Sequence, residues 1–168
     1  MVLGISIATF TAVHVVISLI GIATGVIVVV GMLSGRRLPG WTALFLVTTV
    51  LTSVTGFLFP AAHVLPSHVV GVISLVVLAI TLVALYVQRL AGSWRWIYVT
   101  GAVLALYLNV FVGVVQAFQR VPFLRGLAPT QSEPPFFVAQ LLILAIFVLL
   151  GIRAVVKFRP VVPEPLSS

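Results

Sequence analysis

The chain has 168 residues, of which 62% are hydrophobic and only 7% are charged, and its mean hydropathy is +1.34. This composition lies far outside that of soluble domains and predicts an integral membrane protein, because lipid favours apolar side chains on the outside of a helical bundle. Without cysteine, disulfides, thiolate nucleophiles and iron–sulfur clusters are excluded. The net charge of +7 does not predict a nucleic-acid partner, since the basic residues lie at the ends of apolar runs and form no stripe.

Apolar runs separated by turn residues predict an all-α, up-and-down bundle of five membrane-spanning helices. The turns are marked by glycine, proline and charged residues, such as the two glycines, one proline and two arginines within residues 34–40. Ser67 is expected to cap the third helix. The predicted spans cover residues 7–33, 41–59, 68–87, 96–118 and 136–156, and the tail at residues 157–168 is expected to be disordered.

The distribution of basic residues predicts the orientation of this bundle. Five spans place seven basic residues on one side and only Arg120 and Arg125 on the other. By the positive-inside rule, the N-terminus faces outside and the C-terminal tail lies in the cytoplasm. The seven residues of the cytoplasmic side are Arg36, Arg37, Arg89, Arg95, Arg153, Lys157 and Arg159.

Two of the three histidines are expected to lie at the same depth near the outer boundary of the membrane. His14 lies 22 residues before Arg36, and His68 lies 21 residues before Arg89. These separations match the roughly 20 helical residues that cross an apolar core of about 30 Å. Gln116, 21 residues after Arg95, is expected at that level too, and His63 in the loop above it.

Small and polar residues follow helical spacing on two of the predicted spans. His14, Ser18, Gly21 and Gly25 form one such stripe, and Ala102, Ala105, Asn109, Gly113 and Gln116 form another. Such stripes are typical of helix contact faces in lipid, so both are expected to point inward. The outer half of the bundle would then hold a candidate pocket, closed by the connection at residues 119–135. Its side chains are His14, His63, His68, Asn109, Gln116 and Gln140.

The most specific hypothesis for this pocket is one b-type haem held between the neutral imidazoles of His14 and His68. The alternative is that both histidines are interfacial or bonded to neighbouring helices. A zinc or copper site would need His63 to fold inward. The amides of Asn109, Gln116 and Gln140 have an ordinary use in interhelical hydrogen bonds. The hydroxyls of the second span are expected to donate to carbonyls one turn back.

Four segments resemble small multipass inner-membrane proteins of Gram-negative bacteria. They are Gly-Trp-Thr-Ala-Leu-Phe-Leu at 40–46, Leu-Pro-Ser-His at 65–68, Trp-Arg-Trp-Ile-Tyr at 94–98 and Ala-Pro-Thr-Gln-Ser-Glu-Pro-Pro-Phe at 128–136. This resemblance implies location in the inner membrane and no particular activity. More loosely, His14 and His68 on parallel helices look like the haem-holding helix pairs of b-type membrane cytochromes. The di-haem families have four such histidines, and only three occur here.

The sequence therefore predicts a non-enzymatic inner-membrane protein whose outer-side pocket binds a small ligand. It has no hydrolase motif and no phosphate-binding glycine loop, and no Asp, Glu or Lys falls in the interior of a predicted span. Two other functions remain open. The polar stripes would also suit a structural or accessory subunit of a membrane complex or homo-oligomer, and the hydroxyl and amide groups would suit a small-solute channel.

Overall fold

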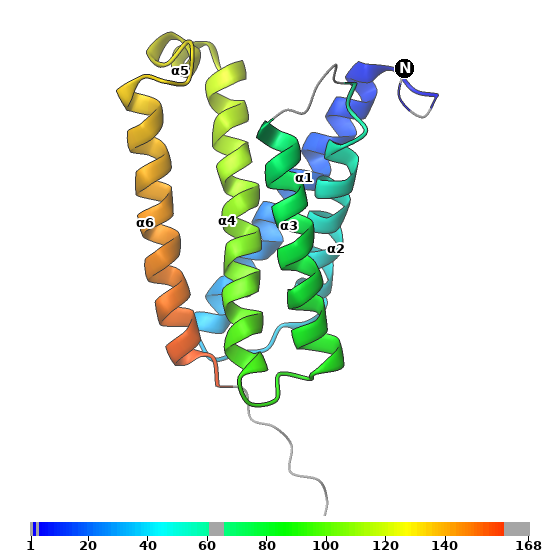
Figure 1. Ribbon diagram of the computed structural model, residues 1–168, viewed down its shortest axis with the longest axis vertical. Coiled ribbons are helices and arrows are strands. Elements are labelled where there is room, and N and C mark those ends of the chain that lie inside the picture. Colours follow the sequence, from blue (N-terminus) through cyan, green and yellow to red (C-terminus); the bar gives the residue numbers. More distant parts are fainter. Residues whose placement is uncertain (1, 3, 61–65, 160–168) are drawn as a thin grey trace, which may run out of the picture.

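The computed structural model describes residue 2 and residues 4–60 and 66–159, and its regular structure in this part of the chain is helical (Figure 1). The all-α prediction is confirmed. The helices are α1 (Ile7–Leu33), α2 (Pro39–Gly56), α3 (Pro66–Leu82), α4 (Trp94–Arg120), α5 (Pro122–Leu127) and α6 (Pro134–Lys157). A π-helical turn, η1 (Val83–Val87), continues α3.

The five long helices run alternately up and down, and α5 lies across the top of α4 and α6 (Figure 1). We call the upper end in this view, which carries the start of α1 and the start of α3, the histidine end. The lower end, which carries the α1–α2 and η1–α4 turns and the end of α6, is the arginine end.

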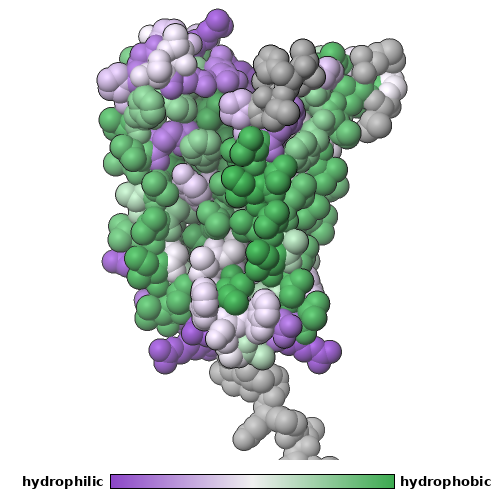
Figure 2. Space-filling model, viewed as in Figure 1, coloured by the Kyte–Doolittle hydropathy of each residue, from purple (hydrophilic) through white to green (hydrophobic). Residues whose placement is uncertain are grey.

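Four of the helices are long and apolar enough to cross a membrane: Ile7–Leu33, Pro66–Val87, Trp94–Arg120 and Pro134–Lys157. The fifth predicted span, α2, has 18 residues and is less apolar, because six of them carry hydroxyl groups. In Figure 2 a broad belt of hydrophobic residues separates two hydrophilic ends. This distribution fits the lipid environment that the composition predicts.

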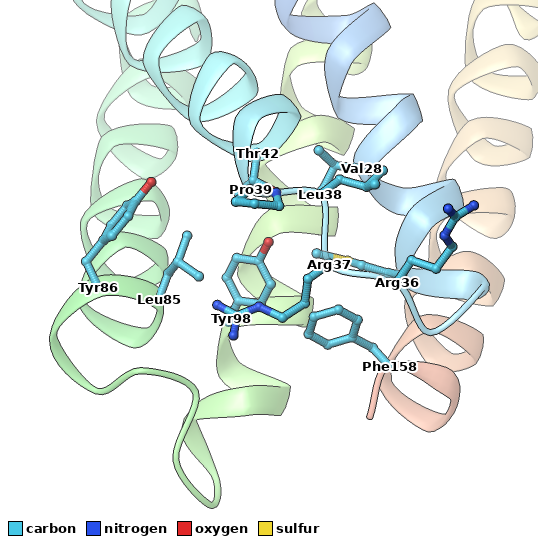
Figure 3. Close-up of a pocket in the computed structure, with 11 residues that line it drawn as sticks. Val28, Arg36, Arg37, Leu38, Pro39, Thr42, Leu85, Tyr86, Tyr98 and Phe158 are labelled. Carbon is cyan, nitrogen blue, oxygen red and sulfur yellow. The ribbon is translucent and has the colours of Figure 1, made fainter. Parts of the chain in front are cut away.

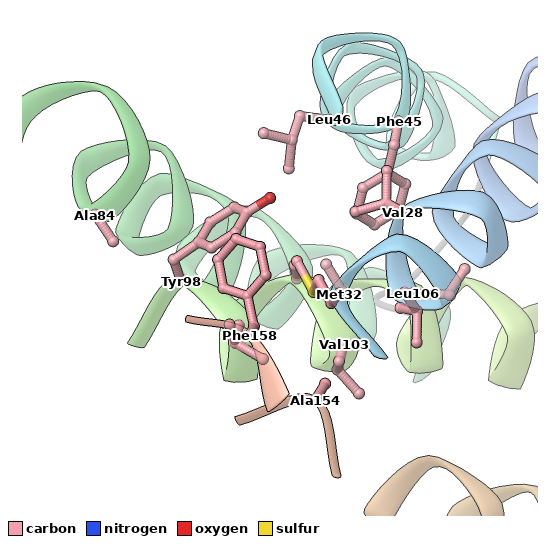
Figure 4. Close-up of a cluster of buried hydrophobic side chains, with 14 of the residues drawn as sticks. Val28, Met32, Phe45, Leu46, Ala84, Tyr98, Val103, Leu106, Ala154 and Phe158 are labelled. Atoms are coloured by element: carbon pink, nitrogen blue, oxygen red, sulfur yellow. The ribbon is translucent and has the colours of Figure 1, made fainter. Parts of the chain in front are cut away.

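The hydrophobic core lies in the half of the bundle nearer the arginine end. Met32 of α1, Phe45 of α2, Leu106 of α4 and Phe158 after α6 are all at most 2% exposed and pack in one cluster (Figure 4). A smaller cluster of Phe118, Ala128 and Phe136 fixes the α5 segment to α4 and α6. The dense core therefore holds one half of the bundle, and the other half is free to open.

Glycine allows the closest helix contacts in the core. A Cβ added to Gly25 would lie 2.7 Å from Leu106 Cδ1 and 2.8 Å from Phe45 Cε2. A Cβ added to Gly101 would overlap the Thr81 hydroxyl. The buried positions Gly21, Gly25, Ala102 and Ala105 confirm that the deeper parts of both small-residue stripes face inward.

Several predicted boundaries are wrong, mainly because prolines were interpreted as the ends of helices. Pro39, Pro66, Pro122 and Pro134 each occupy the first position of a helix, where the missing N–H costs nothing. Ser67 thus lies inside α3 and is not its cap. The last helix reaches Lys157 and Phe158 is buried, so the expected tail starts too early. His63 and residues 160–168 lie outside the described residues.

Candidate ligand-binding cleft

A cleft of about 380 Å³ opens at the histidine end between α1, α2, α3 and α4. Four of the predicted site residues line it: His14, His68, Asn109 and Gln116. Most of the remaining wall is apolar, with side chains such as Leu19, Ile22, Leu108 and Val112. The cleft therefore combines a few polar groups with an apolar surface, as small-molecule sites commonly do.

His14 is held by a hydrogen bond between its Nδ1 and Thr55 Oγ1, which are 2.7 Å apart. The Thr55 hydroxyl donates its one hydrogen to the Leu51 carbonyl at 2.6 Å, so its oxygen is left to accept from the imidazole. This network assigns the proton of a neutral His14 to Nδ1. Nε2 is then the nitrogen with a free lone pair, available to a ligand or a metal ion.

His68 lies in the first turn of α3, and its ring stacks on Phe57 with the ring centroids 5.6 Å apart and the planes 13° from parallel. His14 contacts Phe59 edge to face, with a centroid distance of 5.1 Å. Both imidazoles are therefore positioned by the end of α2 and the residues that follow it. The positive end of the α3 dipole favours a neutral His68 ring.

Contacts deeper in the bundle give the relative heights of these side chains. A Cβ on Gly21 would lie 3.1 Å from Asn109 Nδ2, so these two positions share a level. His14 and Gln116 are each seven residues from it, or ~10 Å towards the histidine end. From the contact between Thr81 and Gly101, His68 is 13 residues away, level with Val114 and ~3 Å from the level of Gln116.

The deepest polar group of the cleft is the Asn109 amide. Asn109 is 8% exposed, and its Nδ2 is buried with no hydrogen-bond partner among the described residues. The Thr52 hydroxyl, also in the cleft wall, is buried without a partner there as well. An unpaired buried donor costs about 1–3 kcal/mol, so an acceptor atom brought into the cleft would be bound favourably at Asn109.

Gln116 and Arg120 form the mouth of the cleft. Arg120 Nε donates to Gln116 Oε1 at 3.1 Å, and both residues line the opening. The sequence analysis used Arg120 only for topology, although it lies four residues after Gln116 and continues the same helical stripe. A guanidinium here gives the mouth affinity for an anionic group on a ligand.

The remaining predicted site residues and the predicted lid do not reach the cleft. Gln140 lies on α6, where its Nε2 donates to the Phe111 carbonyl at 3.3 Å, outside the cleft lining. None of residues 121–135 lines the cleft, because this segment packs over α4 and α6 through Ala128. No group of three His, Asp or Glu side chains able to hold a metal ion occurs within residues 4–60 and 66–159.

The hydroxyls of α2 behave as predicted, with two exceptions that matter for the cleft. Thr48, Thr49 and Ser53 donate to carbonyls one turn back, at 2.7, 2.7 and 2.9 Å. Thr55 does so too but also accepts from His14, and Thr52 leaves its hydroxyl unpaired. These two roles were missed because they depend on which residues of α1 and α4 face α2.

Comparisons of the chain with protein-family models, with curated proteins and with solved structures found no match. The functional argument therefore depends on the cleft and its chemistry.

Proposed function

We propose that this protein is an integral membrane protein of the bacterial inner membrane that binds a small amphipathic ligand in the cleft at its outer, histidine end. The observation that carries the proposal is the buried, unpaired Asn109 Nδ2 in the wall of a cleft that also presents two imidazoles. A bound acceptor atom at Asn109 would remove the cost of the unpaired donor. The protein itself needs to perform no chemistry for this function.

Five spans with the N-terminus outside are part of this proposal. Its support is the set of four long apolar helices, with α2 packed alongside α1 and α3, and the concentration of basic residues at the arginine end. Because the chain has no cysteine, single-cysteine variants test the orientation. In spheroplasts, an impermeant maleimide is expected to label Gly126→Cys, whereas Ser93→Cys should react only after the membrane is opened. The opposite pattern would invert the topology.

One b-type haem between His14 and His68 is the ligand to test first. The two residues line one cleft at nearly the same level, and the tautomer of His14 leaves Nε2 free for iron. Arg120 at the mouth suits a propionate group. In this form of the proposal, the protein holds the iron from both sides and the haem supplies redox chemistry or serves as cargo.

The test is the absorption spectrum of protein purified from cells supplied with ample haem. A Soret band is expected, and it should be lost in both His14→Ala and His68→Ala. Gln140→Ala is the matched control, since Gln140 lies outside the cleft. The absence of a band in the wild-type protein would eliminate haem but leave the amphipathic ligand. Gly113→Leu, which adds a side chain to the cleft wall, should then block binding of any such ligand.

The packing favours a binding site over a channel. Below Asn109 the interior is filled by the core cluster, including Val28, Phe45 and Leu106, each at most 3% exposed. A conducting path would need polar groups through that region. A liposome flux assay is expected to show no leak of small solutes, and a leak abolished by Gly113→Leu would instead favour the channel.

The accessory-subunit alternative would use a different surface. α6 is packed mainly on α4, and only 6% of its most apolar window is buried. In the proposed function this surface faces lipid. Isolation of a stable hetero-complex through α6, together with an empty cleft, would support an accessory role.

A further inference from the structure

A second, smaller cavity lies at the arginine end, on the opposite side of the core from the cleft (Figure 3). Its volume is about 100 Å³, and its polar lining consists of Arg36, Arg37, Thr42, Tyr86 and Tyr98. Since a water molecule takes up roughly 30 Å³, there is room for about three waters or one small tetrahedral anion.

The two arginines of this cavity are not used by the protein itself. Neither guanidinium has a hydrogen-bond or carboxylate partner within the described residues. Arg95, at the same end, shows the contrast, because its Nη1 donates to the carbonyls of Val155 and Phe158. Figure 3 shows the Arg37 side chain reaching across the Tyr98 ring, whereas Arg36 extends the other way. Arg37 is therefore the closer cation to the buried hydroxyls.

Buried hydroxyl and backbone groups complete the wall of the cavity. Tyr98 is 3% exposed and Thr42 is 5% exposed, and the Tyr98 hydroxyl points towards the start of α2 (Figure 3). Helix α2 begins at Pro39, beside the cavity, and no side chain caps it. The N–H groups of its first turn and the positive end of its dipole thus add to the charge of the arginines.

We propose that this cavity binds a phosphate group, with Arg37 as its main cation and the Tyr98 hydroxyl as a buried donor. Guanidinium, hydroxyl and helix N-terminal N–H groups are the donors that commonly bind phosphate. The group belongs either to an anionic lipid headgroup or to a free phosphate ion. The lipid source depends on the proposed membrane insertion; the phosphate chemistry does not. Trp41 and Tyr86, 46% and 57% exposed, are suited to the headgroup level.

The experiment is a titration of the full chain in neutral detergent, followed by calorimetry. Dioctanoyl phosphatidic acid, sodium phosphate and dioctanoylglycerol are the three probes, the last having acyl chains without phosphate. Binding of phosphatidic acid alone would assign the lipid source, and binding of phosphate with competition between the two would assign the free anion. Equal binding of dioctanoylglycerol would overturn the proposal.

Variants separate this site from general attraction to a basic surface. Arg37→Gln is expected to weaken phosphatidic acid binding about fivefold, and Tyr98→Phe, which keeps the buried ring, by a similar factor. Arg89→Gln is the matched control, because Arg89 is exposed at the same end but outside the cavity. An equal loss in all three variants, or no loss in Arg37→Gln, would overturn the proposal. The outcome is independent of the cleft, since no cleft residue is altered.

Discussion

The Nδ1 atom of His14 lies 2.7 Å from the hydroxyl oxygen of Thr55, and this contact joins α1 to the last turn of α2. Two residues further on, Phe57 stacks on His68 of α3. One turn of α2 and its continuation thus position imidazoles from two helices that flank the same cleft. Preorganisation of this kind is expected of residues that bind a common ligand, because it lowers the entropy lost on binding.

The first prediction concerns the Thr55 hydroxyl. In Thr55→Val, His14 loses the acceptor that fixes its tautomer and ring orientation. Loss of such a supporting contact typically lowers ligand or metal affinity about 10- to 100-fold. We expect a loss in that range, measured by haem titration and, if haem does not bind, with whichever ligand co-purifies with the wild-type protein.

A matched control for this variant is Thr24→Val. Thr24 is a buried threonine of α1 whose hydroxyl donates only to the Ile20 and Gly21 carbonyls of its own helix. Ligand affinity should be unchanged in this variant. If the two substitutions lowered affinity equally, the effect would be one of general helix packing and the role given to Thr55 would be wrong.

The second prediction is a trade-off at Asn109. Replacing Asn109 with leucine removes a buried donor that has no partner in the empty cleft. The ligand-free protein is therefore expected to gain about 1–3 kcal/mol of unfolding free energy, while ligand binding is lost. Unfolding by SDS in mixed micelles measures the first effect, and a binding titration measures the second.

Gln140→Leu makes the corresponding change away from the cleft. Gln140 Oε1 is also buried without a partner, but its Nε2 bonds to the Phe111 carbonyl. This variant loses a hydrogen bond and should not gain stability to the same extent, and it should bind ligand normally. A destabilised Asn109→Leu protein would show that Asn109 is a structural amide.

The distances between histidines and arginines in the sequence were informative because a bilayer fixes the length of a helix. That constraint correctly brought His14, His68 and Gln116 to one level, and helical spacing placed Asn109 on the inner side of α4. Periodicity gives the face and depth of a residue but not which neighbour it meets. Gln140 was for that reason assigned to the pocket, although α6 packs on the far side of α4.

Local signals were weakest where one residue type has two uses. Proline both ends a helix and begins one, and here Pro66 and Pro134 begin helices. Likewise, the hydroxyl of Thr55 bonds to its own helix and also accepts from another, and the sequence alone indicates only the local bond. The charge of Arg120 indicated the membrane boundary but not the mouth of a cleft.

The third prediction tests the close helix contacts. Gly101→Val would place a branched side chain against Thr81 on α3, where even a Cβ overlaps the hydroxyl. We expect destabilisation of about 1–3 kcal/mol from overpacking, measured by SDS unfolding. Gly126→Ala is the control, since nothing lies within 4 Å of the added Cβ. A Gly101→Val protein as stable as wild type would mean that α3 and α4 separate more easily than the structure indicates.

The fourth prediction concerns the link between Arg95 and the end of α6. The guanidinium donates to the carbonyls of Val155 and Phe158, which fixes the Phe158 ring 5.9 Å from the Tyr98 ring in the core. Hydrogen bonds from charged donors contribute about 1.5–3 kcal/mol, so Arg95→Gln should lower the unfolding free energy by about that amount. Phe158→Ala should cost about 3–5 kcal/mol, because Phe158 is 2% exposed. The double variant should cost less than the sum of the single changes, since residues that share a contact are coupled. Strict additivity in this cycle would mean that Arg95 does not position Phe158 and that the end of α6 is held by apolar packing alone.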